Sequence, residues 1–553
     1  MHETQRQSQS TITKCIGMLA ACGVLTFMVN APASAQQTLP VSTQSALIAL
    51  PNTQNPAEAE KRLPLAEFYH HVGQKLVWQD SARVDALVDA LQGLADDGLT
   101  PSHYGVGELK ADFQQSHSQD AAAQAVFDLG ATRALLKALD HVQNGKLNPH
   151  DVVPGWDGPS RLKTLPVAGI AQAVMQGDIE QAFARARPQR PYYSPLRQAL
   201  SAYRDLAAQG SVPSFPPREK ALRPGERDDD VVALRRRLTY WGEPGLLVGN
   251  PEAYPQVRIE ELDLREFDAE LEAAVKRFQR RHLLETDGVV GRKTRQALNT
   301  SIKTRVEQLR VNLERGRWVA PWLAREPHVW VDIAGYRMEY VRPNGERWSS
   351  HIVVGSSRRE TPVIHSEITR LTVNPSWTLP PTIVREDILP KVRQNPDYLA
   401  EQGITVINYS GEVVDASEID WASPGNIMLR QPSGSSNPLG DVVMRFPNNA
   451  MVYLHDTPAK GLFGRDRRAL SSGCVRVEGA RELARMLLQD TGSRYQLNAL
   501  INTSRSDINV NLPRHIPLAL HYLTTWPDDE GDVTFREDIY RRDDRILSAL
   551  NQR

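Results

Sequence analysis

The sequence contains few cysteines. Among 553 residues there are three, Cys15, Cys22 and Cys474, and the first two lie in an N-terminal segment that we expect to be removed. A mature chain with the single thiol of Cys474 cannot form an internal disulfide, which excludes a disulfide-stabilised fold. A lone free thiol in an exported protein is open to oxidation and mispairing, so Cys474 is either a buried apolar residue or a reactive one.

An excess of charge of either sign is also absent. The chain has 65 Lys and Arg against 66 Asp and Glu, a formal net charge of −1. This balance excludes the strong basic field of a nucleic-acid-binding protein, so no nucleic-acid partner is expected. The 14 histidines show no His-Glu-x-x-His pattern, and the adjacent pair His70-His71 would point apart on a helix. We therefore expect no metal ion and no other cofactor, which argues against a zinc peptidase.

Only the N-terminus carries a long apolar run. Basic residues precede an apolar stretch from Cys15 to Val29, and the small residues Ala33-Ser34-Ala35 follow it. This order is typical of a secretory signal peptide over residues 1–35, so we expect a periplasmic protein. An uncleaved anchor and lipoprotein processing at Leu19-Ala20-Ala21-Cys22 are the alternatives. Contact with the membrane is expected only through such an uncleaved anchor.

The chain length predicts several domains. Residues 36–60, rich in Gln, Thr, Asn, Pro and Ala, are interpreted as a linker. Residues 61–218 show apolar residues at helical spacing, as in Val84–Leu91, and predict a helical scaffold domain without catalytic groups. A break rich in Pro and Ser at 211–225 ends it.

Residues 226–300 predict a compact helical unit. Val231, Leu234 and Leu238 share one helical face, and Leu271, Val275 and Phe278 share another. With the turn Asp287-Gly288-Val289-Val290-Gly291 and the run Thr294…Ala297-Leu298-Asn299, the unit resembles a peptidoglycan-binding domain of the three-helix type. The loop of residues 243–268, with Gly245 and Gly249, is longer than that pattern needs, so glycan binding by this unit is left open.

Residues 326–503 predict a mostly β domain. Short runs rich in β-branched residues, such as Val329–Ile333 and His351–Gly355, flank the hairpin turn Asn344-Gly345. Residues 380–440 form an insertion interpreted as an active-site lid, with a purely structural excursion as the alternative. Residues 504–553 are interpreted as a C-terminal extension. The fold class expected is thus α+β multidomain, with two helical domains and a mostly β domain.

Candidate chemistry lies between His455 and Cys474. His455 ends an apolar strand, and Cys474 follows nineteen residues later within Leu470-Ser471-Ser472-Gly473-Cys474-Val475-Arg476-Val477. A thiol nucleophile needs a base, which His455 can supply, and backbone N–H groups for the oxyanion, which a turn at Gly473 could aim. Arg476 alternates with Cys474, so both leave one face of a strand, where a guanidinium could grip a substrate carboxylate.

These residues resemble the motif of the YkuD-type L,D-transpeptidases, which have a histidine followed by a Ser/Thr-x-Gly-Cys-hydrophobic-Arg/Asn run. The upstream elements Val354-Gly355, Thr361-Pro362 and Asn374-Pro375-Ser376-Trp377 are similar to those of the family. The domain order, with Arg430-Gln431-Pro432 and Asn437-Pro438-Leu439-Gly440, resembles the YcbB-like branch. Ser472 departs from the family pattern, because many members have histidine at that position.

The resemblance implies an enzyme in which Cys474 attacks a tetrapeptide stem, releases D-alanine, and passes the acyl group to a neighbouring stem to form a 3→3 cross-link. It implies that His455 is the base and that the N–H groups of Gly473 and Cys474 hold the oxyanion. It also implies acylation by carbapenems and the partners peptidoglycan stems, glycan and other wall synthases. The substrate-binding candidates are Arg476, Ser472, Tyr453, Trp377 and Trp421. A carboxypeptidase, a protein-to-wall anchoring enzyme and a non-catalytic wall-binding protein are the alternatives.

Overall fold

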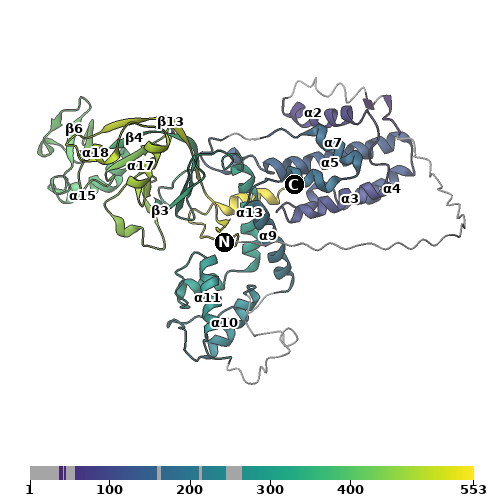
Figure 1. The fold of residues 1–553 in the computed structure, drawn as a ribbon, viewed down its shortest axis with the longest axis horizontal. Coiled ribbons are helices and arrows are strands. Elements are labelled where there is room, and N and C mark those ends of the chain that lie inside the picture. Colours follow the sequence, from purple (N-terminus) through teal and green to yellow (C-terminus); the bar gives the residue numbers. More distant parts are fainter. Residues whose placement is uncertain (1–36, 42, 45–55, 159–162, 211–213, 244–263) are drawn as a thin grey trace, which may run out of the picture.

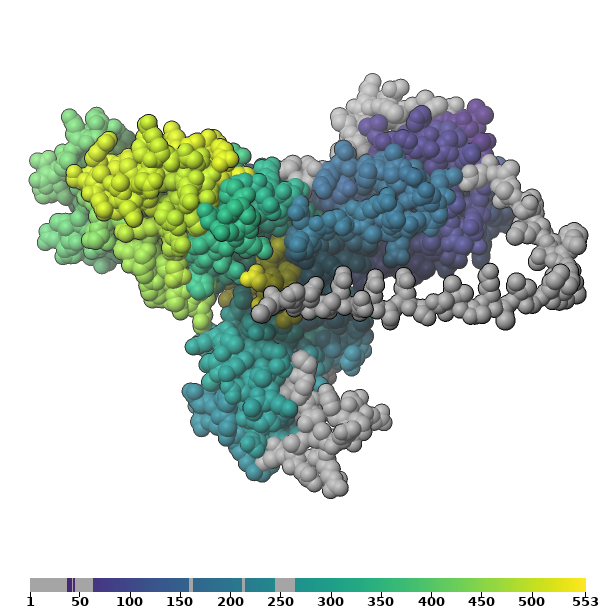
Figure 2. Space-filling view, viewed as in Figure 1, coloured from purple at the N-terminus to yellow at the C-terminus, as the bar shows by residue number. Residues whose placement is uncertain are grey.

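The computed structural model describes residues 37–41, 43–44, 56–158, 163–210, 214–243 and 264–553 (Figure 1). The signal peptide expected over residues 1–35, most of the expected linker, and Gly245 and Gly249 lie outside the described residues. Within the described ranges, no helix is both long and apolar enough to cross a membrane. Three lobes meet around the long helix α13 (Ile302–Val319), and the space-filling view shows the middle lobe of residues 214–298, in teal, projecting below the other two (Figure 2).

The N-terminal lobe is helical, as the spacing of apolar residues predicts. Its core includes Leu87 and Leu135, both fully buried. The buried carboxylate of Asp128 accepts the backbone N–H groups of Val77 and Trp78 at 2.8 and 2.7 Å, which fixes the segment between the first two helices. The helices are α2 (Pro56–His71), α3 (Ser81–Gln92), α4 (Leu109–His117), α5 (Ala121–Asn144), α6 (Pro149–Val152), α7 (Val167–Gln176), α8 (Ile179–Ala186) and α9 (Tyr193–Ala208).

The middle lobe is the expected compact helical unit. It contains α10 (Asp229–Tyr240), α11 (Ala269–Arg281) and α12 (Arg292–Leu298). The Gln279 side chain fixes the tight turn, because its oxygen accepts the Gly288 N–H at 2.9 Å and its amide donates to the Val289 carbonyl at 3.0 Å. The six apolar residues expected on the two helical faces are all fully buried: Val231, Leu234, Leu238, Leu271, Val275 and Phe278.

The C-terminal lobe is built on one nine-stranded sheet with the order β11-β3-β12-β10-β9-β4-β13-β1-β2. Because β2 also pairs with β3, the sheet curls until it closes on itself. Helix α17 (Ala480–Asp490) packs Leu483 and Leu487 into its core, beside α18 (Leu497–Ile501). The strands are β1 (His328–Asp332), β2 (Arg337–Val341), β3 (Arg347–Gly355), β4 (Ile364–Val373), β9 (Val442–Arg445), β10 (Leu454–His455), β11 (Ala469–Ser471), β12 (Val475–Val477) and β13 (Ile508–His521).

The strand β13 corrects the boundary expected after residue 503. It pairs with β1 in parallel and with β4 in antiparallel register, so the segment expected to be an extension lies inside the sheet. The hairpin of β14 (Thr525–Pro527) and β15 (Val533–Phe535) and the helix α19 (Asp543–Asn551) follow.

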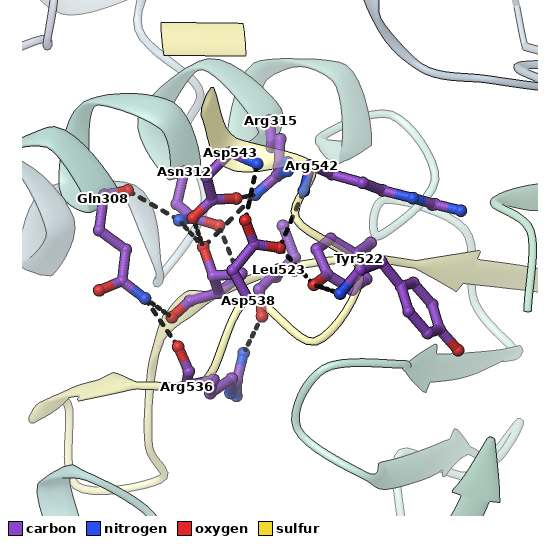
Figure 3. Close-up of polar contacts among 11 residues, drawn as sticks. Gln308, Asn312, Arg315, Tyr522, Leu523, Arg536, Asp538, Arg542 and Asp543 are labelled. Atoms are coloured by element: carbon purple, nitrogen blue, oxygen red, sulfur yellow. Dashed lines mark hydrogen bonds and ion pairs between the residues drawn. The ribbon is translucent and has the colours of Figure 1, made fainter. Parts of the chain in front are cut away.

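A polar cluster ties this C-terminal segment to α13 (Figure 3). Arg315 of α13 forms an ion pair with Asp543 at 2.6 Å, and Gln308 donates to the Arg536 carbonyl at 2.9 Å. Asp538 accepts the Tyr522 hydroxyl at 2.5 Å. The end of the chain is thereby fixed against the helix at the centre of the molecule.

The insertion of residues 380–440 folds as a small subdomain with a four-stranded sheet of its own, in the order β5-β8-β6-β7. Its apolar core includes Leu379, Val392 and Leu429. Asn437, fully buried at its base, donates to the carbonyls of Pro375 and Pro432, both at 3.0 Å, and so joins the insertion to the main sheet. Its elements are β5 (Trp377–Thr378), α14 (Pro381–Ile383), a π-helical turn (Val384–Ile388), α15 (Leu389–Gln394), α16 (Tyr398–Glu401), β6 (Thr405–Asn408), β7 (Val413–Val414) and β8 (Ile427–Gln431).

The helix α13 is buried although it is rich in charge. Glu314 and Arg317 are 0% and 1% exposed and form an ion pair at 2.7 Å. Arg317 also donates to the Tyr193 hydroxyl at 2.9 Å, and the Leu147 N–H donates to Glu314 at 2.7 Å. These partners satisfy both charges, so the helix can occupy the junction of the lobes.

Candidate active site

Four of the residues expected in the site form a two-by-two array on one face of the sheet. In the parallel ladder between β10 and β12, His455 lies opposite Arg476, and the Val475 N–H donates to the Tyr453 carbonyl at 3.1 Å. This register places Tyr453 beside Cys474. Because alternate residues of a strand share a face, all four side chains lie together. The Tyr453 and His455 rings are in edge contact, with centroids 5.6 Å apart.

The loop that carries Cys474 depends on a glycine. Gly473 has φ +113°, a backbone conformation that residues with a Cβ rarely adopt. Ser471 closes the loop from inside: its hydroxyl donates to the Cys474 carbonyl at 2.5 Å and accepts the Gly473 N–H at 3.1 Å. The Gly473 N–H expected to hold an oxyanion is therefore already hydrogen-bonded within the loop. The described residues provide no acceptor for the Cys474 N–H, which points to this group as the remaining backbone donor.

A second layer holds the loop from behind. The fully buried Thr361 accepts the Gly355 N–H and donates to the Gly473 carbonyl, both at 2.8 Å. The Tyr540 hydroxyl, from the C-terminal segment, accepts the Thr361 N–H at 3.2 Å and donates to the Gly355 carbonyl at 2.7 Å. Two segments far from Cys474 in sequence therefore set the position of its loop.

The Cys474 thiol is free and half-buried, and its sulfur lies 3.9 Å from the Met451 carbonyl oxygen. Burial raises the pKa of Cys474 above its usual range, while hydrogen bonds from Tyr453 and the charges of Arg445 and Arg476 oppose that rise. Met451 has φ +54°, and the Asn448 side chain holds its turn by accepting the Ala450 and Val452 N–H groups at 3.1 and 3.0 Å.

His455 is 4% exposed, and its Nδ1 lies 2.5 Å from the Asp456 carbonyl oxygen. A carbonyl can only accept, so Nδ1 carries the proton and Nε2 is left as the acceptor of the neutral ring. Burial and the neighbouring Arg476 lower the pKa of His455 to about 3. Among the described residues no hydrogen bond joins His455 to Cys474; the groups that contact the thiol are Tyr453 and the Met451 carbonyl.

Trp377 and Ser472 lie next to the array, each linked to it through a hydrogen bond. The Trp377 indole donates to the Tyr453 hydroxyl, and Tyr453 interacts in turn with Cys474. The exposed Ser472 hydroxyl accepts a hydrogen bond from Arg359 at 3.0 Å. Arg359 also forms ion pairs with Glu386, at 2.7 Å, and with Asp387 of the insertion. Ser472 is thereby linked to the insertion.

Arg476 lies in the array, whereas Trp421 lies in the core of the insertion. Arg476 is half-buried, and its Nε has no hydrogen-bond partner among the described residues; burial lowers its pKa. Trp421 packs against the apolar core of the insertion, and its indole donates to the Ala416 carbonyl at 3.1 Å. No described contact brings Trp421 to Cys474, which differs from the cleft wall expected from the sequence.

Sequence reasoning missed Arg359, Met451 and Tyr540 as parts of the site. Thr361 was noted only as part of a motif. Asn448-Asn449 before Met451 is a turn signal that could have been found, since asparagine side chains cap their own backbone. Nothing local marks Tyr540, because its role arises from the pairing of β13. Among the described residues, no group of three or more His, Cys, Asp or Glu side chains could hold a metal ion.

Comparisons with known protein families match three parts of the chain. Residues 326–498 match the family model described as "L,D-transpeptidase catalytic domain". Residues 64–200 match "Scaffold domain", and residues 227–298 match "Putative peptidoglycan binding domain". A relative from Haemophilus influenzae, named "Putative L,D-transpeptidase", is 36% identical over 227 residues, which is 40% of this chain and 46% of the relative. The chain thus spans about half the length of that curated relative.

Proposed function

We propose that the protein is an L,D-transpeptidase that forms 3→3 cross-links in peptidoglycan with Cys474 as its nucleophile. Residues 326–498 match the L,D-transpeptidase catalytic domain, and they follow segments that match a scaffold domain and a peptidoglycan-binding domain. The observation that carries the proposal is the array of His455 and Arg476 on β10 and β12 with Tyr453 and Cys474, which directly precede these strands.

The resting site holds two neutral partners. The pKa of the Cys474 thiol is raised by burial, and the pKa of His455 is lowered to about 3, so at neutral pH the pair is a thiol and a neutral imidazole. In the proposed first step, Nε2 of His455 takes the thiol proton as a donor stem enters. The Tyr453 hydroxyl and the charge of Arg476 stabilise the thiolate. Catalytic hydrogen bonds often shorten only when substrate binds.

Acyl transfer then proceeds in two halves. The Cys474 thiolate adds to the carbonyl of the third stem residue, a diamino acid, and the Cys474 N–H holds the oxyanion. The C–N bond to the terminal D-alanine breaks, the His455 imidazolium gives its proton to the leaving amine, and a thioester remains. The side-chain amine of an acceptor stem then attacks the thioester and loses a proton to His455. The C–S bond breaks, and the thiolate returns as the leaving group.

The insertion is proposed to act as a lid over this site. Its links to the site are the Arg359 bridge to Ser472 and the Trp377 contact with Tyr453. A peptidoglycan substrate agrees with the presence of a domain that matches peptidoglycan-binding proteins. Both agree with a periplasmic location after export. Stem peptides and glycan, with other wall synthases, are the proposed partners.

Incubation of tetrapeptide muropeptides with the protein, followed by mass spectrometry, tests the proposal. We expect cross-linked dimers, release of D-alanine, and a thioester adduct on Cys474, all lost in Cys474→Ala. Dimers that persist in Cys474→Ala would refute the proposal. Loss of D-alanine without dimers would identify water as the acceptor, as in a carboxypeptidase. A chelator should leave the activity unchanged, and a carbapenem should add its mass to Cys474.

A further inference from the structure

A cleft of about 670 Å³ lies beside the catalytic array, on the side of Tyr453. Leu379 and Pro380, at the base of the insertion, line it together with Tyr453. Arg445, Arg370 and Asn511 of the main sheet also line it, together with Thr369. The same tyrosine that contacts the Cys474 thiol thus lines this cleft.

Arg445, Arg370 and Asn511 form one row across neighbouring strands. Arg370 of β4 lies directly opposite Arg445 of β9 on one side and opposite Asn511 of β13 on the other. Side chains opposite each other in an antiparallel ladder have Cβ atoms about 4.5–5.5 Å apart. Like charges at such positions destabilise a sheet, so two facing arginines need a compensating group.

No acidic side chain among the described residues supplies that compensation. Among the described residues, neither Arg370 nor Arg445 has a carboxylate within 4.0 Å, and no acid lines the cleft. Arg445 donates from Nε to the Thr372 hydroxyl at 2.9 Å and lies over the Tyr453 ring, 5.4 Å from its centroid. These contacts fix Arg445 and leave its two terminal nitrogens for a ligand. A planar guanidinium with two free N–H groups is suited to a carboxylate.

We propose that Arg370 and Arg445 form the subsite for the terminal carboxylate of the donor stem peptide. The inference rests on the proposed function. The leaving D-alanine carries that carboxylate one residue beyond the carbonyl that Cys474 attacks, and consecutive Cα atoms are about 3.8 Å apart. Tyr453 lies between the nucleophile and the arginines, since its hydroxyl interacts with the Cys474 sulfur and its ring packs under Arg445. Asn511 adds a neutral donor at the end of the row.

Binding to the Cys474→Ala protein tests the subsite without turnover. Calorimetry would compare a tetrapeptide stem that has a free terminal carboxylate with the same peptide as its C-terminal amide. We expect the acid to bind roughly tenfold or more tightly than the amide, since a charge-assisted pair is lost. Adding Arg445→Gln should remove most of this preference, and Arg370→Gln should remove a smaller part because Arg370 is exposed.

Two further variants make the result specific. Arg445→Lys keeps the charge but not the planar fork, so it should retain part of the preference. Arg485→Gln, on the exposed face of α17, removes a charge outside the cleft lining and should retain all of it. A preference that survives Arg370→Gln/Arg445→Gln, or a loss equal for acid and amide, would overturn the inference.

Acylation of the wild-type protein by the donor alone, without an acceptor stem, separates this inference from the proposed function. If Cys474 is not acylated while the arginine-dependent preference persists, the proposed reaction fails and the subsite stands. If Cys474 is acylated equally well by acid and amide, whichever residues occupy 370 and 445, the subsite fails and the reaction stands. An effect of the arginines confined to the step with acceptor would assign the carboxylate to the acceptor and overturn the donor assignment.

Discussion

The Tyr453 hydroxyl gives the sharpest test of the site, because one atom separates tyrosine from phenylalanine. It accepts a hydrogen bond from the Trp377 indole, so its own proton is free to point at the Cys474 sulfur. In Tyr453→Phe the ring keeps its contacts with His455 and Arg445, whereas the donor to the thiolate is lost.

The size of the effect follows from the charge of the thiolate. A hydrogen bond to a charged group contributes about 1.5–3 kcal/mol, and one pKa unit corresponds to about 1.4 kcal/mol. The pKa of Cys474, already raised by burial, should therefore rise by roughly one to two further units. At neutral pH, D-alanine release should fall by about 10- to 100-fold, since the thiolate population falls by that factor.

The assay is the rate of Cys474 alkylation by iodoacetamide as a function of pH. Wild type and Tyr453→Phe should give curves of the same form, with the variant displaced to higher pH. Tyr495→Phe changes a tyrosine that is 40% exposed outside the array and should leave the curve in place. An alkylation curve in Tyr453→Phe that coincides with the wild-type curve would show that the hydroxyl does not stabilise the thiolate.

Three further predictions concern the parts that support the site. Thr361→Val should lower the free energy of unfolding by about 2–4 kcal/mol and slow acylation, because it leaves the Gly355 N–H and the Gly473 carbonyl unpaired. Urea titration measures the loss of stability. Thr361→Ser keeps the hydroxyl, so its failure to recover the stability would contradict the reasoning. Glu314→Gln should lower the free energy of unfolding by about 3–5 kcal/mol in the same titration, since Arg317 would keep a buried unpaired charge. The double variant Glu314→Gln/Arg317→Met should recover part of that loss. An unchanged urea midpoint in Glu314→Gln would refute this prediction. Burial lowers the pKa of His282, so the unfolded state binds more protons than the folded state below about pH 6.5. The stability that His282 contributes should therefore fall as the pH falls below that value. A stability difference between wild type and His282→Phe that stays constant from pH 7.5 to 5 would contradict this prediction.

The sequence predicts well those parts of the fold whose residues follow a simple pattern. The two apolar faces of the middle lobe have helical spacing, and every one of those residues is buried. The helix α13 escapes such reasoning because its buried face is charged: Glu314 and Arg317 pair with each other, and Tyr193 and Leu147 from distant segments complete their hydrogen bonds. No local pattern predicts that the sheet continues past residue 503, because the strands that pair with β13, namely β1 and β4, lie more than a hundred residues upstream.

The site likewise has residues that the sequence predicts and residues whose positions depend on the folded chain. Alternation along strands was enough to expect Cys474 and Arg476 on one face, while the neighbouring positions of Tyr453 and His455 depend on the register of β10 against β12. Trp421 was expected at the cleft, but its partners are the apolar residues of the insertion, and a single aromatic residue in a sequence does not reveal which core it joins. The lowered pKa of His455 also depends on burial that only the folded chain provides.

The place of Tyr540 has a consequence for the order of events during synthesis. A growing chain that has already delivered His455 and Cys474 still lacks β13, which separates β4 from β1 in the sheet, and the hydroxyl that holds Gly355 and Thr361 behind the nucleophile loop. The thiol can be present for some time before its loop has a fixed shape. A chain interrupted between Cys474 and β13 would thus carry the reactive residues without the strand and the hydroxyl that align them.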